Sequence, residues 1–176
     1  MINFWERGSI HGDEYYTQKE DAEIIADNIL SLPLKVWCPF NDKESVWGEV
    51  LSERGFDVIT TDTDFFLTSP PPGVQCIISN PPFSRKKEVM DRIRLLGLKF
   101  VLIFPFQWLN DGVPLEYGNQ LMFFRQRMFF NTPEGIKNKP RANCFVLSNG
   151  LLNSNLIFID KRTLTNQVKL IERSNR

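Results

Sequence analysis

Four consecutive residues, Asn80-Pro81-Pro82-Phe83, combine a side chain and a backbone that could position a planar amine. The asparagine carbonyl accepts hydrogen bonds, while each proline removes a backbone N–H and fixes one φ angle. The carbonyls of this stiff segment therefore have few local donors, and the Phe83 ring can stack on a flat group. Such a segment suits a site that accepts hydrogen bonds from the amine of a planar ligand.

The neighbouring sequence predicts where these four residues lie. They follow the short apolar run Cys76–Ser79, which predicts a buried strand, and they precede a helical pattern over residues 85–96 with Ser84 as its N-cap. Open α/β sheets bind ligands outside the carboxyl ends of their strands. We therefore expect Asn80 at the carboxyl end of a parallel strand, where a ligand can reach it.

The rest of the chain alternates predicted strands and helices, which is typical of a parallel sheet with helices on both faces. Thr17 and Glu20 form a capping-box pattern that predicts a helix to about Leu30. Residues 107–119 are expected to form a long loop. The other expected helix covers 45–54, and the other expected strands cover 34–38, 57–61, 100–104, 121–130 as one strand or two, 142–147 and 156–160.

These elements predict a single domain over residues 1–176, with an irregular arm at 1–16 and a frayed tail from 167. The predicted fold class is a Rossmann-like, doubly wound α/β fold with a mostly parallel sheet. The strand-rich final third predicts an antiparallel edge at the C-terminal side of that sheet.

The tetrad resembles the catalytic motif of the amino-methyltransferases that use S-adenosylmethionine (SAM) to methylate N6 of adenine in DNA. Other stretches are similar to those of a small prophage-borne group of phage-type adenine methyltransferases: Asp13-Glu14-Tyr15-Tyr16-Thr17, Trp37-Cys38-Pro39-Phe40 and Asp64-Phe65-Phe66. The resemblance covers about residues 13–105 well and the remainder loosely. It implies a SAM-dependent methyltransferase fold.

The resemblance also implies roles for individual residues. The Asn80 side chain and the Pro81 carbonyl would accept the amine hydrogens, with Phe83 stacked on an adenine that is flipped out or single-stranded. Asp62, at the end of the second predicted strand, would accept both ribose hydroxyls of SAM. The implied catalytic residues are Asn80, Pro81, Pro82 and Phe83, and the implied cofactor residues are Tyr16, Thr17, Trp37, Cys38, Pro39, Phe40, Asp62 and Asn80.

The first loop departs from the broad family. Most such enzymes place a glycine-rich turn after the first strand, whereas residues 38–45 contain no glycine. Side chains must then replace the backbone contacts to the cofactor. This departure keeps open a catalytically weakened SAM-binding or nucleic-acid-binding module as an alternative.

Charge is distributed unevenly along the chain and predicts a polyanionic partner such as DNA. Residues 1–70 contain 14 acidic and 5 basic residues, whereas residues 71–176 contain 7 acidic and 16 basic residues. Arg125 and Arg127 lie two positions apart within the largely apolar stretch 121–130 and are expected on one strand face. The predicted phosphate contacts are Arg125, Arg127, Lys137, Lys139 and Arg141.

Several classes of function are disfavoured. No apolar run is long enough to span a membrane, and Cys38, Cys76 and Cys144 lack metal-ligand spacing, so we expect a cytoplasmic protein without a metal. A single histidine argues against Ser–His or Cys–His catalysis. A methyltransferase acting on protein glutamine amides and a different nucleotide-binding α/β enzyme remain alternatives. Because 93 residues follow Phe83, we expect a partner protein to supply any long recognition site.

Overall fold

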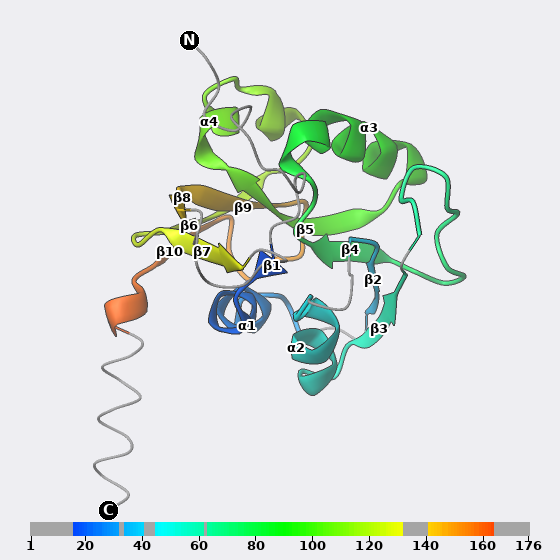
Figure 1. The fold of residues 1–176 in the computed structure, drawn as a ribbon, viewed down its shortest axis with the longest axis horizontal. Helices are drawn as coiled ribbons and strands as arrows, with labels where there is room; N and C mark the ends of the chain where they lie inside the picture. Colours follow the sequence, from blue (N-terminus) through cyan, green and yellow to red (C-terminus); the bar gives the residue numbers. More distant parts are fainter. Residues whose placement is uncertain (1–15, 32–33, 41–44, 62, 132–140, 164–176) are drawn as a thin grey trace, which may run out of the picture.

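The computed structural model describes residues 16–31, 34–40, 45–61, 63–131 and 141–163, and a seven-stranded sheet forms its centre (Figure 1). The strand order across this sheet is β10-β6-β9-β5-β4-β2-β3. The strands are β2 (Lys35–Cys38), β3 (Asp57–Thr60), β4 (Cys76–Ser79), β5 (Lys99–Pro105), β6 (Gln120–Phe124), β9 (Cys144–Ser148) and β10 (Leu156–Ile159).

The sheet is mostly parallel, as the alternation of strands and helices predicts. Among the described strands of this sheet only β9 runs in the opposite direction, paired antiparallel with both β5 and β6. The prediction of an antiparallel strand is confirmed, but its predicted position at the edge of the sheet is wrong. The antiparallel strand lies inside the sheet, and the outermost strand β10 is parallel to β6 because the loop after β9 crosses over β6.

Helices cover both faces of the sheet (Figure 1). On one face α1 (Lys19–Asp27) and α2 (Trp47–Glu53) contribute buried residues to one hydrophobic cluster. On the other face α3 (Lys86–Leu96) and α4 (Phe106–Leu109) contribute to a second cluster. Side chains along β5 alternate between the two clusters, as the two-residue repeat of a strand requires.

The chain reverses its direction of winding between β2 and β4. The crossover after β2 runs through α2 on one face to β3, whereas the crossover after β4 runs through α3 on the other face to β5. The loops that leave β2 and β4 therefore diverge to opposite faces, although the two strands pair with each other. This is the topological switch point at which open α/β sheets bind ligands.

A second, three-stranded sheet consists of β1 (Tyr16–Thr17), β7 (Met128–Asn131) and β8 (Arg141–Ala142) in the order β1-β7-β8. Both pairings are antiparallel, and Thr17 lies opposite Phe130. The capping-box prediction is wrong, because Thr17 belongs to β1 and Gln18 occupies the N-cap position of α1. The helix also ends at Asp27, three residues earlier than predicted.

Two further boundaries differ from the sequence prediction. A 3-10 turn, η1 (Phe83–Arg85), precedes α3, so Arg85 rather than Ser84 occupies the N-cap position. The region predicted as a long loop contains α4 and a second 3-10 turn, η2 (Val113–Glu116). Packing against α3 stabilises this region, since the Tyr117 hydroxyl donates to Asp91 and the Arg94 guanidinium lies 4.2 Å from the centre of the Tyr117 ring.

Gly118 lies where the chain passes closely over the sheet. A β-carbon at this position would lie 2.6 Å from the backbone oxygen of Ser148 and 3.1 Å from side-chain atoms of Leu147 and Phe100. We therefore expect Gly118→Ala to lower the free energy of unfolding by about 1–3 kcal/mol through overpacking. Urea denaturation would measure the loss, and Asn119→Ala, which changes the exposed neighbouring side chain, should leave the midpoint nearly unchanged. Equal midpoints for the two variants would contradict this account of the close approach.

Candidate functional site

Asn80 follows β4 directly and so lies at the carboxyl edge of the sheet, as predicted. On one side β4 pairs with β2, and on the other side it pairs with β5, with Ser79 opposite Leu102. Asn80 therefore lies at the switch point, between the end of β2 and the end of β5. The tetrad therefore lies at the same edge of the sheet as the switch point between β2 and β4.

The conformation of the tetrad leaves one carbonyl without a local donor. Pro82 is extended, with φ −61° and ψ 123°, and its carbonyl accepts the Arg85 N–H at 3.3 Å. Lys86 Nζ donates to the Phe83 carbonyl, also at 3.3 Å. Among the described residues no donor lies within hydrogen-bond distance of the Pro81 carbonyl. The Asn80 side-chain oxygen is itself buried, so both acceptors expected for an amine lie at this edge.

The Phe83 ring is buried rather than presented on the surface. The residue is only 5% exposed, and its ring lies edge-on to that of Phe130, with centroids 6.1 Å apart and an interplanar angle of 89°. A base could stack on the Phe83 ring only after the contact with Phe130 opens. Since Phe130 belongs to β7, the small sheet forms one wall of the candidate site.

The small sheet also brings Tyr16 and Thr17 to the tetrad. Thr17 lies opposite Phe130 in the β1–β7 pair, and Phe130 in turn contacts Phe83. Two segments that are far apart in the sequence and that the resemblance assigned to one site therefore meet through β7. The hydroxyls of Thr17 and Ser79 are buried and have no hydrogen-bond partner within the described part of the chain. Buried polar atoms of this kind are typical of a site that accepts a ligand.

At the end of β2, Trp37 and Cys38 are completely buried, Pro39 is buried and Phe40 is half-buried. Trp37 Nε1 donates to Thr61 Oγ1 at 2.9 Å, which joins the end of β2 to the segment after β3. Trp37 therefore positions the residues on either side rather than offering its own ring to a ligand. Burial raises the pKa of the Cys38 thiol, so it stays protonated and is a poor nucleophile.

Asp62 lies outside the described residues, and the turn that follows it contains Asp64 and Phe66. Asp64 Oδ1 accepts the Phe66 N–H at 2.7 Å and closes the turn that follows β3. The Arg85 guanidinium lies 3.6 Å from the centre of the Phe66 ring, so the turn after β3 contacts the segment after the tetrad. Sequence reasoning missed this cation–π contact, which links the second and third strand ends.

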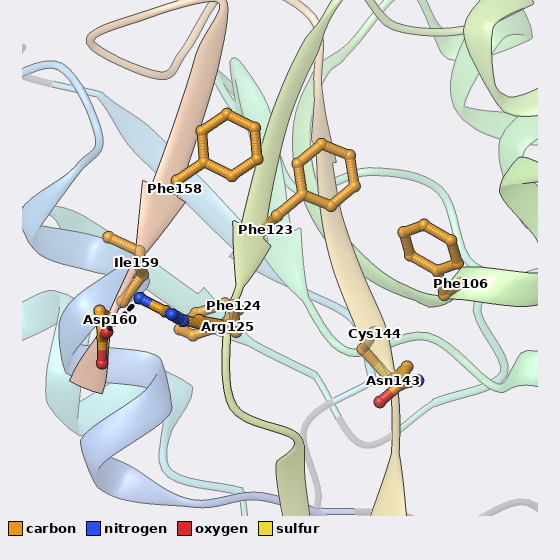
Figure 2. A pocket seen from close by; sticks show the side chains of 9 residues that line it. All are labelled: Phe106, Phe123, Phe124, Arg125, Asn143, Cys144, Phe158, Ile159 and Asp160. Atoms are coloured by element: carbon orange, nitrogen blue, oxygen red, sulfur yellow. Dashed lines mark hydrogen bonds and ion pairs between the residues drawn. The ribbon is translucent and has the colours of Figure 1, made fainter. Parts of the chain in front are cut away.

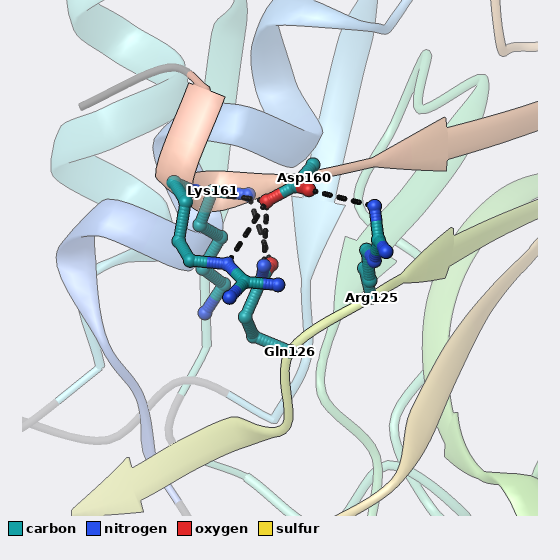
Figure 3. Close-up of polar contacts among 5 residues, drawn as sticks. Arg125, Gln126, Asp160 and Lys161 are labelled. Carbon is teal, nitrogen blue, oxygen red and sulfur yellow. Dashed lines mark hydrogen bonds and ion pairs between the residues drawn. The ribbon is translucent and has the colours of Figure 1, made fainter. Parts of the chain in front are cut away.

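The predicted phosphate-binding residues are only partly brought together. Arg125 and Arg127 lie in an exposed bend between β6 and β7, so the prediction that they share a strand face is wrong. The chain must turn there because β6 and β7 belong to different sheets. Arg125 Nη1 lies 3.2 Å from Asp160 Oδ2 (Figure 3). Arg141 begins β8, while Lys137 and Lys139 lie outside the described residues.

Sequence reasoning also missed a buried ion pair beneath the small sheet. The Asp21 carboxylate of α1 is 1% exposed and forms an ion pair with the Lys161 ammonium. Burial raises the pKa of Asp21 more than the neighbouring ammonium lowers it. This ion pair therefore connects α1 to the residues after β10, and no sequence pattern pairs positions this far apart.

Comparison with known proteins gives no family assignment, since no family model and no curated protein matches the chain. Within the described residues, no group of three or more histidine, cysteine, aspartate or glutamate side chains could bind a metal ion. Over the same residues, no helix has the length and apolarity required to cross a membrane.

Proposed function

We propose that this chain is a SAM-dependent methyltransferase that acts on N6 of adenine in DNA. The observation that carries the proposal is the position of Asn80-Pro81-Pro82-Phe83, directly after β4 and beside β2 at the switch point. Chance would place such a tetrad anywhere along the chain, whereas its chemistry requires the carboxyl edge of the sheet.

The residues around this edge fit the cofactor that the motif implies. The buried Thr17 and Ser79 hydroxyls offer polar contacts that the described residues leave unused. We infer that Tyr16, Thr17, Asp62 and the loop after β2 bind SAM. When bound, SAM supplies an electrophilic methyl group.

The protein's own contribution is to position the amine. The exocyclic nitrogen of adenine has two hydrogens and a lone pair delocalised into the ring. The Asn80 side-chain carbonyl and the Pro81 carbonyl accept these hydrogens, which draws the nitrogen toward tetrahedral geometry and directs its lone pair out of the plane of the base. The paired prolines restrict the backbone that carries both acceptors before the substrate arrives, so little backbone reorganisation is needed.

The charge distribution favours DNA over the glutamine-amide alternative. Residues 71–176 carry a net charge of +9, and the tetrad lies within this cationic part. Phosphate contacts supply affinity for DNA of any sequence, whereas a glutamine side chain in a protein requires no such charge. Binding that does not weaken between low and moderate salt would support the protein substrate instead.

The experiment that tests the proposal is isothermal titration of the purified chain with SAM. We expect binding, and we expect Asp62→Ala to weaken it by about 1–3 kcal/mol, because hydrogen bonds to a charged group are lost. Asp111→Ala removes an exposed carboxylate elsewhere and should leave affinity unchanged. Undetectable binding by the unmutated protein at millimolar SAM would refute the proposal.

A further inference from the structure

Three phenylalanine rings, Phe106, Phe123 and Phe158, lie in a row (Figure 2). Phe106 follows β5, Phe123 lies on β6 and Phe158 lies on β10. The centroids of Phe106 and Phe123 are 5.9 Å apart, and those of Phe123 and Phe158 are 5.7 Å apart, with the second pair stacked at 24°. We call these three residues the aromatic row. They line a cleft of about 610 Å³.

The aromatic row faces solvent to an unusual extent. Phe158 is 73% exposed and Phe106 is 39% exposed, although a ring of this size normally becomes buried. Leu156, two residues before Phe158 on β10, is also exposed. Neighbouring exposed apolar side chains of this kind are typical of a surface that binds a partner.

Charged side chains gather at one end of the cleft. Arg125 lines it, and the guanidinium groups of Arg125 and Arg162 contact the same carboxylate, Asp160, at 3.2 Å and 3.7 Å. Arg127 is exposed in the adjoining bend. The two guanidinium groups against one carboxylate leave a net positive charge at this end of the cleft, which we call the arginine rim and which complements a polyanion.

The aromatic row begins one strand away from β4, the strand that Asn80 follows. Phe106 follows β5, the strand next to β4, and Phe158 lies on β10, three strands beyond β5. The two centroid distances, 5.9 Å and 5.7 Å, limit the row to about 12 Å from the Phe106 ring to the Phe158 ring. At a rise of about 3.4 Å per nucleotide, this length corresponds to about three nucleotides.

We propose that the aromatic row stacks unpaired nucleobases that flank the target base, while the arginine rim contacts their phosphates. This inference rests on the proposed function, because it assumes that the strand that carries the target adenine also binds the aromatic row. Flat rings beside cationic groups are the arrangement that binds single-stranded nucleic acid without regard to sequence. A second copy of the chain fits less well, because a two-fold contact over this cleft would bring two positive rims together.

Fluorescence anisotropy with the full chain, without SAM, tests the proposal. The probes are a labelled single-stranded oligonucleotide and an abasic strand of the same length at the same salt concentration. We expect the base-containing strand to bind at least tenfold more tightly, and we expect Phe158→Ala to weaken its binding about tenfold while leaving binding of the abasic strand unchanged. Phe158→Trp should retain affinity. Leu95→Ala, which removes another strongly exposed apolar side chain, is the matched control.

Three results would overturn the proposal: equal binding of the two strands, unchanged affinity of Phe158→Ala, or a dimer of the parent that Phe158→Ala dissociates in sedimentation. The outcome is separate from that of the proposed function. If Phe158→Ala loses single-strand affinity but the parent transfers no methyl group, the stacking role of the aromatic row is supported and the enzyme assignment fails. If the parent methylates DNA and Phe158→Ala does so with an unchanged KM for DNA, the enzyme assignment is correct and the row has no such role.

Discussion

Replacing Asn80 by alanine is expected to abolish methyl transfer to adenine while leaving the fold and the affinity for SAM nearly unchanged. The side-chain carbonyl acts on the amine of the substrate, and removal of one positioned hydrogen-bonding group typically costs a hundredfold or more in rate. The half-buried position of Asn80 after β4 should tolerate a smaller side chain. The measurement is transfer of a labelled methyl group from SAM to adenine-containing DNA, with nucleoside analysis of the product.

Asn153→Ala is a suitable control for this experiment, because it removes an exposed asparagine from another loop and should retain full activity. Phe83→Ala is less informative, since Phe83 is buried against Phe130 and its loss would also disturb the core. If Asn80→Ala methylates DNA as fast as the parent, the tetrad is structural. If the parent binds SAM but transfers nothing to any DNA, the glycine-free loop marks a binding module.

Lys161→Met should destabilise the fold by about 3–5 kcal/mol, because it leaves a buried carboxylate without its counter-charge. Asp21 is 1% exposed, so its carboxylate would stay buried after the ammonium is removed. Methionine preserves most of the side-chain volume, so the loss reports charge rather than a cavity. Urea denaturation at neutral pH measures the change. The double variant Asp21→Asn, Lys161→Met should recover most of the free energy of unfolding. If the single and the double variant lose the same amount, packing rather than charge dominates.

The pH dependence of the Lys161→Met variant provides an independent test of the same ion pair. Burial already raises the pKa of Asp21 in the parent, and loss of the ammonium should raise it further. An acid with a raised pKa in the folded state stabilises that state as pH falls, because the folded protein takes up the proton first. The deficit of Lys161→Met relative to the parent should therefore shrink on acidification from neutral pH. A deficit independent of pH would argue against the charge explanation.

Sequence patterns predicted the elements whose signals are local. The run Cys76–Ser79 is a strand with the predicted boundaries, because four consecutive apolar or small residues suit a strand that is buried on both faces. The helix before Gly97 ends as predicted, since Gly97 adopts a φ of +66° that favours glycine. These two features suffice to predict Asn80 at the carboxyl end of a strand.

Features that depend on distant partners could not be predicted in this way. Thr17 has the side chain for a helix cap, yet its backbone pairs with Phe130 of β7, and this pairing is invisible in the local pattern. Arg125 lies between two apolar runs that could form one strand, although the chain there passes from one sheet to another. The buried pair of Asp21 and Lys161 likewise depends on tertiary structure, because charged residues rarely predict their own burial.

The pairing of β1 with β7 has a consequence for the order in which the protein assembles. Tyr16 lies opposite Asn131, more than a hundred positions later in the chain, so the pair closes a very long loop for two residues of strand. The entropy of that closure favours late formation, after the parallel strands and their short crossovers have already condensed. During synthesis on the ribosome, β2 to β5 can therefore fold while Thr17 still lacks its partner strand. The wall that encloses the tetrad is then completed only once β7 has emerged.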